Sequence, residues 1–119
     1  MQYLLLCCFD EQQWDTLPGP QREGIMQAYG EWIERTAGSG HYRAGGKLES
    51  SASATTVRVK NGKAAITDGP FAETKEQLGG YHVVECRDLD EALALAQGIP
   101  TLAAGGTIEV RPLARVLPG

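Results

Sequence analysis

The sequence has no long hydrophobic run. Its longest apolar stretch covers residues 3–9, whereas a membrane-spanning helix needs about 20 consecutive apolar residues. No basic segment and no small-residue cleavage site accompany this stretch, so it lacks the pattern of a signal peptide. We therefore expect a protein that does not interact with a membrane.

Cysteine and histidine are scarce as well. Cys7, Cys8 and Cys86 form no CxxC motif and no Cys/His ligand spacing, and there are only two histidines, so we expect no metal site. An odd number of cysteines without a secretion signal indicates reduced thiols and a cytoplasmic location. The GxGxxG and Walker phosphate-binding motifs are absent too. These absences predict a protein that works without a cofactor.

Positive charge is also in short supply. The 119 residues include 11 Lys and Arg against 15 Asp and Glu, for a formal net charge of −4. A general nucleic-acid binder needs a basic face to neutralise phosphates, so we do not expect direct binding to nucleic acid. With 42% hydrophobic residues, the chain has the length and composition of one domain over residues 1–119.

What the sequence does contain is the pattern of two β-α-β units. In the first unit, residues 3–9 form a continuous apolar run, which is typical of a strand covered on both faces. Residues 10–19 have the composition of a loop, and residues 21–36 show a helical apolar stripe. That stripe consists of Ile25, Tyr29, Trp32 and Ile33. Residues 41–48 then predict a second strand, weakened by a pair of glycines.

A hairpin separates the two units. Val57 and Val59 alternate with basic residues, and the Asn61-Gly62 pair then favours a type I′ turn. The basic side chains are typical of a solvated strand edge, where charge prevents edge-to-edge pairing. Asn-Gly between two alternating segments therefore predicts a β-hairpin.

The second unit begins with a strand over residues 81–86. Asp88 is placed to cap a helix, with Glu91 three residues later as its capping-box partner. The inner stripe of that helix is expected to be Leu89, Ala92, Leu93 and Ala96, and Gly98 and Pro100 end it. Residues 107–113 predict the last strand.

Two right-handed β-α-β units predict an α+β ferredoxin-like fold, in which an antiparallel sheet carries both helices on one face. The other face of such a sheet also needs a cover, and the chain has no third long helix to supply it. A second copy of the sheet would provide that cover. We therefore expect a homodimer.

Residues 67–81, with the sequence TDGPFAETKEQLGGY, are the most informative segment. An aspartate held at a strand end by Gly-Pro can present a reactive group at a pocket mouth, or it can simply stabilise a turn. The segment closely resembles the signature of the DGPF branch of the YciI-like (YCII-related) family. Further matches in the same register cover residues 1–6, 54–58, 87–93 and 108–112. The resemblance thus extends over essentially the whole chain.

The resemblance implies a ferredoxin-like subunit that assembles into a dimeric α/β barrel. It also implies a bacterial protein, since relatives are small bacterial proteins and similar domains occur beside sigma factors of the extracytoplasmic-function type. The broader family is suspected of enzymatic activity at a His/Asp pair in a dimer-associated pocket. The residues that match this pair are His41, within Gly-His-Tyr, and Asp68.

Asp68 and His41 are therefore the candidate catalytic residues. Asp68 would act as a general base or orient a histidine; the alternative is a turn aspartate whose oxygens accept backbone N–H bonds. His41 follows a helix C-terminus, which favours imidazolium and suits acid/base work. The alternative is an exposed or hydrogen-bonded loop histidine. If the two side chains share a pocket, the carboxylate would fix the imidazole tautomer.

The candidate substrate-binding residues are Phe71, Glu73 and Lys75, with Lys75 as the partner of an anion. The alternative is that they form only a solvated turn. His82 is interpreted as a structural histidine of a sheet strand. Tyr29 and Trp32 are interpreted as core residues because they lie on the apolar helix stripe.

Together these features predict a small-molecule enzyme with cofactor-free acid/base chemistry on a small polar ligand, in a pocket near Asp68 and His41. The alternative is a non-catalytic ligand-sensing or partner-binding module, for example one that acts with a sigma factor. Folds of this kind serve both purposes, so the fold does not decide between them.

Overall fold

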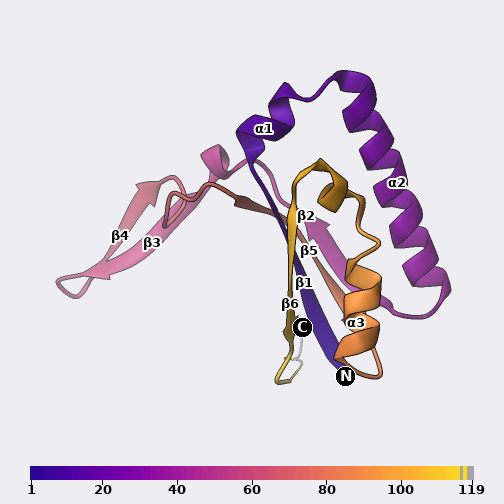
Figure 1. Cartoon of the computed structure of the whole chain (residues 1–119). Helices are drawn as coiled ribbons and strands as arrows, with labels where there is room; N and C mark the ends of the chain where they lie inside the picture. The colour runs from indigo at the N-terminus through magenta and orange to yellow at the C-terminus, as the bar shows by residue number, and fades with distance from the viewer. Residues whose placement is uncertain (116, 118–119) are drawn as a thin grey trace.

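A computed structural model describes residues 1–115 and 117 (Figure 1). Its centre is a four-stranded antiparallel sheet with strand order β2-β5-β1-β6. The strands are β1 (Gln2–Phe9), β2 (Tyr42–Lys47), β5 (Gln77–Glu85) and β6 (Thr107–Pro112). Because β5 lies between β1 and β2, the two β-α-β units interlock. This order confirms the ferredoxin-like prediction.

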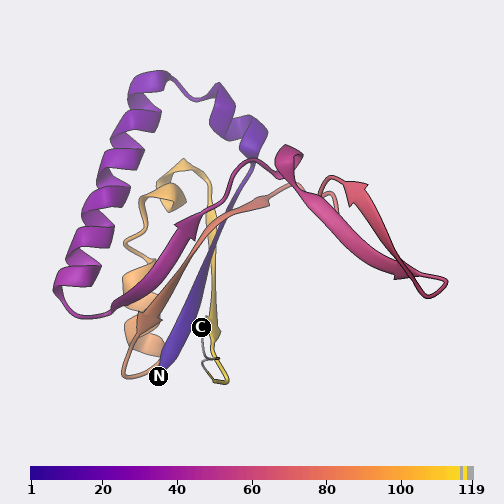
Figure 2. The same ribbon diagram turned by 180° about the vertical axis from the view of Figure 1, so that it is seen from behind.

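Two helices form a layer on one face of this sheet. They are α2 (Gly19–Gly38) and α3 (Leu89–Ala96), which follow β1 and β5 in the chain. Figures 1 and 2 show both helices on the same side of the sheet. A short 3₁₀ helix, η2 (Pro100–Ala104), joins α3 to β6. In the described part of the chain, no helix is both long and apolar enough to cross a membrane.

The core lies between the sheet and the helix layer. β1 alternates strictly, with Tyr3, Leu5 and Cys7 buried while the intervening side chains stay half-buried. The buried hydrophobic residues are Tyr3, Leu5, Cys7, Trp32, Val84, Cys86, Ala92, Ala96 and Ile99. The continuous apolar run of β1 predicts burial on both faces, but within one chain only the helix-facing side is fully covered.

Residues 10–19 do not form the expected loop. They contain helix α1 (Glu11–Thr16), which Asp10 caps by accepting bonds from the amides of Gln12 and Gln13 at 3.0 and 3.2 Å. Trp14 on this helix packs against Phe9, with ring centroids 5.9 Å apart. The cap and this aromatic contact stabilise a helix too short to show an apolar stripe in the sequence. The Pro-Gly-Pro segment starts α2 rather than closing a loop.

The second unit also departs from the sequence pattern in detail. Gly79 and Gly80 do not break the chain but lie inside β5, beside an irregularity in its pairing with β1. On α3, only the alanines of the expected stripe are buried, while Leu89 and Leu93 are 46% and 39% exposed. Small alanines face inward because α3 packs closely against the sheet.

Residues 55–68, called the arm from here on, form the predicted hairpin from β3 (Thr55–Lys60) and β4 (Lys63–Asp68). Asn61 and Gly62 have φ angles of 52° and 77°, as a type I′ turn requires. The arm is a separate two-stranded sheet that projects from the rest of the chain (Figure 2).

The fold predicts unequal costs for two leucine truncations. Leu5→Ala should lower the free energy of unfolding by about 2–5 kcal/mol, because Leu5 is fully buried and leaves a cavity. Leu93→Ala should cost less than about 1 kcal/mol, because Leu93 is largely exposed and alanine favours helix. Urea denaturation of both variants measures the difference. Equal losses would mean that α3 turns its leucine stripe inward after all.

Candidate functional site

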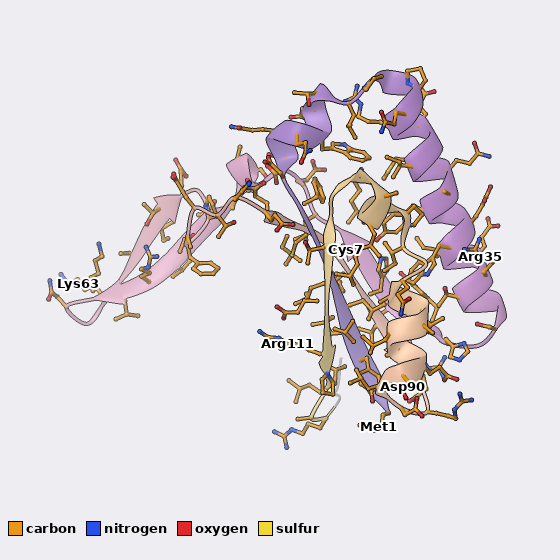
Figure 3. The ribbon with its side chains drawn as sticks, in the orientation of Figure 1. Met1, Cys7, Arg35, Lys63, Asp90 and Arg111 are labelled. Carbon is orange, nitrogen blue, oxygen red and sulfur yellow. The ribbon has the colours of Figure 1, made fainter. Side chains whose placement is uncertain are left out.

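A pocket of about 320 Å³ opens between the helices and the sheet. Its walls are mostly apolar and aromatic. Strands contribute Cys7, Phe9, Tyr42, Gly45, Gly46, Lys47, Gly79, Gly80 and His82, and helical segments contribute Gln13, Trp14, Met26, Tyr29, Ile33, Thr101 and Ala104. Figure 3 shows Cys7 in the space between the sheet and α2. Pockets with few polar groups on apolar walls are typical of small-molecule sites.

His82 is the central polar residue of this pocket. Its side chain is buried, and both ring nitrogens are hydrogen-bonded to tyrosine hydroxyls. Nε2 contacts the Tyr29 hydroxyl, and Nδ1 lies 2.8 Å from the Tyr42 hydroxyl. The Tyr29 oxygen is also 3.4 Å from the Cys7 sulfur. The four side chains therefore form one connected chain, Cys7–Tyr29–His82–Tyr42, which ends at the pocket.

Aromatic rings fix the imidazole from several sides. The His82 ring centroid lies 5.0 Å from Trp32 and 5.5 Å from each of Tyr29 and Tyr42. Tyr29 and Trp32 reach it because they lie three residues apart on the inner face of α2. Tyr42 reaches it from β2, where it pairs with Val84, two residues beyond His82. Strand alternation thus directs Tyr42 and His82 to the same face of the sheet.

Gly45 provides the room that this arrangement needs. It lies directly opposite His82 in the β2–β5 register. A Cβ atom at this position would overlap the Tyr42 hydroxyl and lie 2.7 Å from His82 Nδ1. At the pocket mouth, a Cβ on Gly79 would overlap the ring of Phe9. Glycine at these positions keeps the pocket open and leaves the Tyr42–His82 hydrogen bond intact.

Burial keeps the whole cluster uncharged at neutral pH. It lowers the pKa of His82 to about 4, because a charged imidazolium loses its hydration there. The pKa values of Tyr29 and Tyr42 are raised, again chiefly by burial. Burial also raises the pKa of the Cys7 thiol. A neutral imidazole has one N–H and one lone pair, so it donates to one tyrosine and accepts from the other.

The structure places the predicted catalytic pair at two separate positions. His41 follows α2, with Nδ1 2.7 Å from the Ser39 hydroxyl and Nε2 3.2 Å from Glu91 Oε1. Asp68 ends β4 on the arm, where it is exposed opposite Thr55. Within one chain the two side chains do not meet, and neither lines the pocket around His82. Their catalytic role stays a prediction, for which a second copy would have to complete the pair.

The three predicted substrate-binding residues lie near the base of the arm. Phe71 is 77% exposed, and its carbonyl accepts a 2.8 Å bond from Arg58 Nη2. Glu73 is exposed. Lys75 borders a second, polar cavity of about 270 Å³. Their roles likewise stay predictions.

Sequence reasoning missed His82 as a functional candidate. The signal that points to it is the alternation Gly80, His82, Val84, which aligns the imidazole with the buried face of β5. A histidine on a buried face needs hydrogen-bond partners, and the sequence offers no carboxylate on the facing helix stripe. The tyrosines interpreted as core residues are those partners. In residues 1–115 and 117, no three His, Cys, Asp or Glu side chains cluster so as to hold a metal ion.

The fold and pocket define a ferredoxin-like α+β protein with a mostly apolar pocket beneath its helices. A family model for the YCII-related domain matches residues 1–116, and the chain belongs to that family. It is 35% identical over 120 residues to an uncharacterised protein of Rhizobium meliloti (strain 1021), covering 100% of this chain and 97% of that relative.

A solved structure shares the fold. It is 5-chloro-2-hydroxyhydroquinone dehydrochlorinase from Burkholderia phenoliruptrix AC1100, in complex with 2,5-dihydroxybenzoquinone. The TM-score is 0.57 with 15% sequence identity, over 98% of this chain and 96% of that one. At this identity the likeness concerns the fold alone.

The low pKa of His82 predicts a specific loss of stability in acid. Below about pH 6.5 the unfolded chain protonates this histidine, while the folded chain does so only near pH 4. The free energy of unfolding should therefore fall by about 2–3 kcal/mol from this residue as the pH drops from 6.5 to 4. Urea denaturation across this range should show a smaller loss for His82→Gln. His41→Gln, the control, should keep the wild-type loss. A wild-type loss in His82→Gln would contradict the buried neutral state.

Gly45→Ala should disrupt the cluster although all four of its side chains remain unsubstituted. The added methyl group displaces the Tyr42 hydroxyl from His82, which should cost about 1–3 kcal/mol in the free energy of unfolding. Gly24→Ala on α2 is the matched control, because its Cβ meets no atom within 4 Å. Alanine there should stabilise the helix by about 0.5–1 kcal/mol. Equal shifts of the denaturation midpoint in Gly45→Ala and Gly24→Ala would contradict the close approach of Gly45 to Tyr42 and His82.

Proposed function

We propose that this protein is an enzyme that transfers a proton from a small ring compound at Tyr42 and His82, without a cofactor. The observation that carries the proposal is the buried, neutral His82, bonded through both nitrogens to tyrosines at the base of an apolar pocket. A cluster of this kind, in a pocket and with a shifted pKa, is the expected form of an acid/base site. The sequence alone predicts a polar ligand. The apolar walls favour a planar ring that turns its polar group toward Tyr42.

The Cys7 contact favours one tautomer of His82. If Nε2 carries the proton, it donates to the Tyr29 oxygen, and the Tyr29 hydroxyl then donates to the Cys7 sulfur. Nδ1 is left with a lone pair, which accepts the Tyr42 proton. Every N–H and O–H donor in the chain then has an acceptor. This arrangement leaves the Tyr42 oxygen with a free lone pair toward the pocket.

A proton can then move in two linked steps. The ligand hydroxyl gives its proton to the Tyr42 oxygen, while Tyr42 gives its own proton to His82 Nδ1. The ligand becomes an anion and His82 an imidazolium, and Tyr42 remains neutral between them. After the ligand anion leaves, the proton on Nδ1 passes through the Tyr42 oxygen to solvent water, which restores the neutral cluster. No other atom changes its bonding, so the Tyr29 and Cys7 side of the chain stays in place.

The low basicity of His82 restricts the substrate class. A base with a pKa of about 4 accepts protons efficiently only from comparably acidic groups. Hydroxyl groups conjugated to a carbonyl, as in hydroxyquinones, belong to this class, whereas ordinary alcohols do not. The solved neighbour with this fold was captured with 2,5-dihydroxybenzoquinone, a compound of this type. This agreement supports the choice of a hydroxyquinone as the probe.

The working form of the protein is proposed to be a cytoplasmic homodimer. One face of the sheet, called the outer face, carries Leu4, Leu6, Cys8, Leu78, Tyr81 and Val83 in adjacent register positions of β1 and β5. Tyr81 and Leu78 are 37% and 41% exposed in the single chain. A second copy packed on this face would bury these side chains. A dimer would also allow His41 of one copy to contact Asp68 of the other copy.

The test of the function is binding and turnover of 2,5-dihydroxybenzoquinone and chlorinated hydroxyhydroquinones. Tyr42→Phe and His82→Gln should each weaken binding of 2,5-dihydroxybenzoquinone at least about tenfold, since each removes a polar contact to the ligand or its support. Calorimetric titration measures the affinity, and circular dichroism confirms that the variants fold. Any turnover should fall as the pH decreases toward 4, because His82 is then already protonated in the free protein and cannot accept a proton from the ligand.

His41→Ala and Asp68→Asn are the parallel variants. Loss of turnover in these two variants alone would move the chemistry to the pair implied by the family resemblance. Binding without turnover in the wild type would support the ligand-sensing module instead. Ligand affinity unchanged in both Tyr42→Phe and His82→Gln would overturn the proposed site.

A further inference from the structure

The arm exposes an apolar face that its own chain does not cover. Val57, Val59 and Ile66 point to the same side of the hairpin, because Val57 pairs with Ile66 and Val59 with Ala64. These three side chains are 65%, 74% and 72% exposed. Within the described residues, β3 and β4 pair only with each other. Lys63 at the tip lies far from the main sheet (Figure 3).

Hydrogen bonds to the flanking residues close the base of the arm. Thr56 donates from its hydroxyl to the Gly69 carbonyl at 2.7 Å, and the Gly69 amide donates to the Ala54 carbonyl at 2.7 Å. Arg58 reaches the Phe71 carbonyl at 2.8 Å. These bonds extend the hairpin pairing to the flanking residues but cover none of the apolar face of the arm. A lone two-stranded hairpin is marginally stable in water, so the arm needs a further packing partner.

Charge indicates the nature of that partner. Of the 11 basic and 15 acidic residues in the chain, the arm holds three basic ones and a single acidic one. The arm therefore carries a net charge of +2, and the rest of the chain carries −6. The arm is thus electrostatically complementary to the body of its own kind of chain. Its own body does not use this complementarity, because the arm projects away from it.

The outer face of the sheet has the matching properties. It is apolar, and two acids border it near Cys8: Glu109 pairs with Leu6, and Glu76 accepts a 2.8 Å bond from the Thr107 hydroxyl. Both carboxylates raise the pKa of Cys8 electrostatically, after the larger effect of burial, which places them beside this face. One chain therefore holds two uncovered apolar surfaces: the arm, whose cations lie on its opposite face, and the outer face, which is bordered by Glu76 and by Glu109 with its ion-pair partner Arg111.

We infer that the arm of each copy packs its apolar face on the body of a second copy, beside that copy's outer sheet face. This inference rests on the homodimer proposed above and adds to it a contact that sheet packing alone does not include. In a two-fold dimer, each chain gives one arm and receives one, so both uncovered surfaces are buried together. The basic side chains of the arm lie on its opposite face, so their charge attracts the arm to the acidic body at long range and makes no direct contact in this interface.

Paired lysine substitutions on the two faces of the arm test this contact. Val57→Lys/Ile66→Lys changes the apolar face, and Ala65→Lys/Thr67→Lys adds the same charge to the opposite face. Sedimentation velocity over a concentration series gives the dimer dissociation constant. The apolar-face variant should raise this constant at least tenfold, although its extra charge favours an acidic partner, and the control should stay within about threefold of the wild type. An unchanged constant in the apolar-face variant, or an equal rise in both, would overturn the inference.

Leu6→Lys on the outer face separates the arm contact from the dimer itself. Dissociation by Leu6→Lys with no effect of Val57→Lys/Ile66→Lys would keep the dimer and refute the arm contact. A wild-type protein that is monomeric at all concentrations would refute both. Circular dichroism confirms that each variant retains the folded body.

Photo-crosslinking gives a direct check on the same contact. Benzoylphenylalanine at position 59, on the apolar face, should form a covalent dimer whose cross-linked peptides come from the body of the other copy. The same probe at position 60, on the opposite face, should give a yield of covalent dimer that is at least fivefold lower. Cross-links only within one chain, or equal yields from both positions, would contradict the inference.

Discussion

The packing of Trp32 between the helices and the sheet organises both the core and the site. Its indole N–H donates to the Leu95 carbonyl at 2.9 Å, which joins α2 to α3. Its ring meets His82, Tyr29 and Tyr42 with centroid separations of 5.0 to 6.3 Å. A Cβ on Gly98 would lie 3.1 Å from this ring, so the backbone just after α3 also packs closely against Trp32. The helix layer and the pocket floor therefore share one buried side chain.

The consequence of this packing is an imidazole that stays neutral. Aromatic rings exclude water from His82, and the two tyrosines satisfy its nitrogens without supplying a charge. A carboxylate partner would have raised the histidine pKa, as in a triad, and suited it to strong bases. Two hydroxyls instead leave burial as the dominant effect and give a weak base. The site is therefore suited to acidic ligands or to hydrogen bonding without net charge transfer.

A single ferredoxin-like subunit cannot cover all of its apolar surface. The two helices shield one face of a four-stranded sheet, and the outer face and the arm remain open. Small domains bury a limited share of their surface, so large exposed aliphatic side chains on a hairpin are costly to keep in water. The opposite net charges of the arm and the body favour the self-association proposed above.

Local rules explain how much of the fold was predictable from the sequence. The apolar run over residues 3–9, the helical stripe of α2 and the Asn61-Gly62 turn each depend on neighbours in the chain, and the strand, the helix and the turn that they predict are present in the structure. The sequence pattern does not predict the short helix α1, because the helix is stabilised by a tertiary contact between Trp14 and Phe9. The predicted strand begins at residue 81, after the two glycines of β5, because the space that requires these glycines is formed by Phe9 and by β2.

By itself, the sequence determined the ferredoxin-like fold, the family and part of the core, because periodicity, turn chemistry and motifs can be read along the chain. Only the tertiary structure decided where the candidate site lies. His82 became its centre because β5, α2 and β2 bring an imidazole and two tyrosine hydroxyls together from positions up to 53 residues apart. Proximity of this kind, and the burial that sets a pKa, arise from packing between distant segments and leave no periodic pattern in the chain.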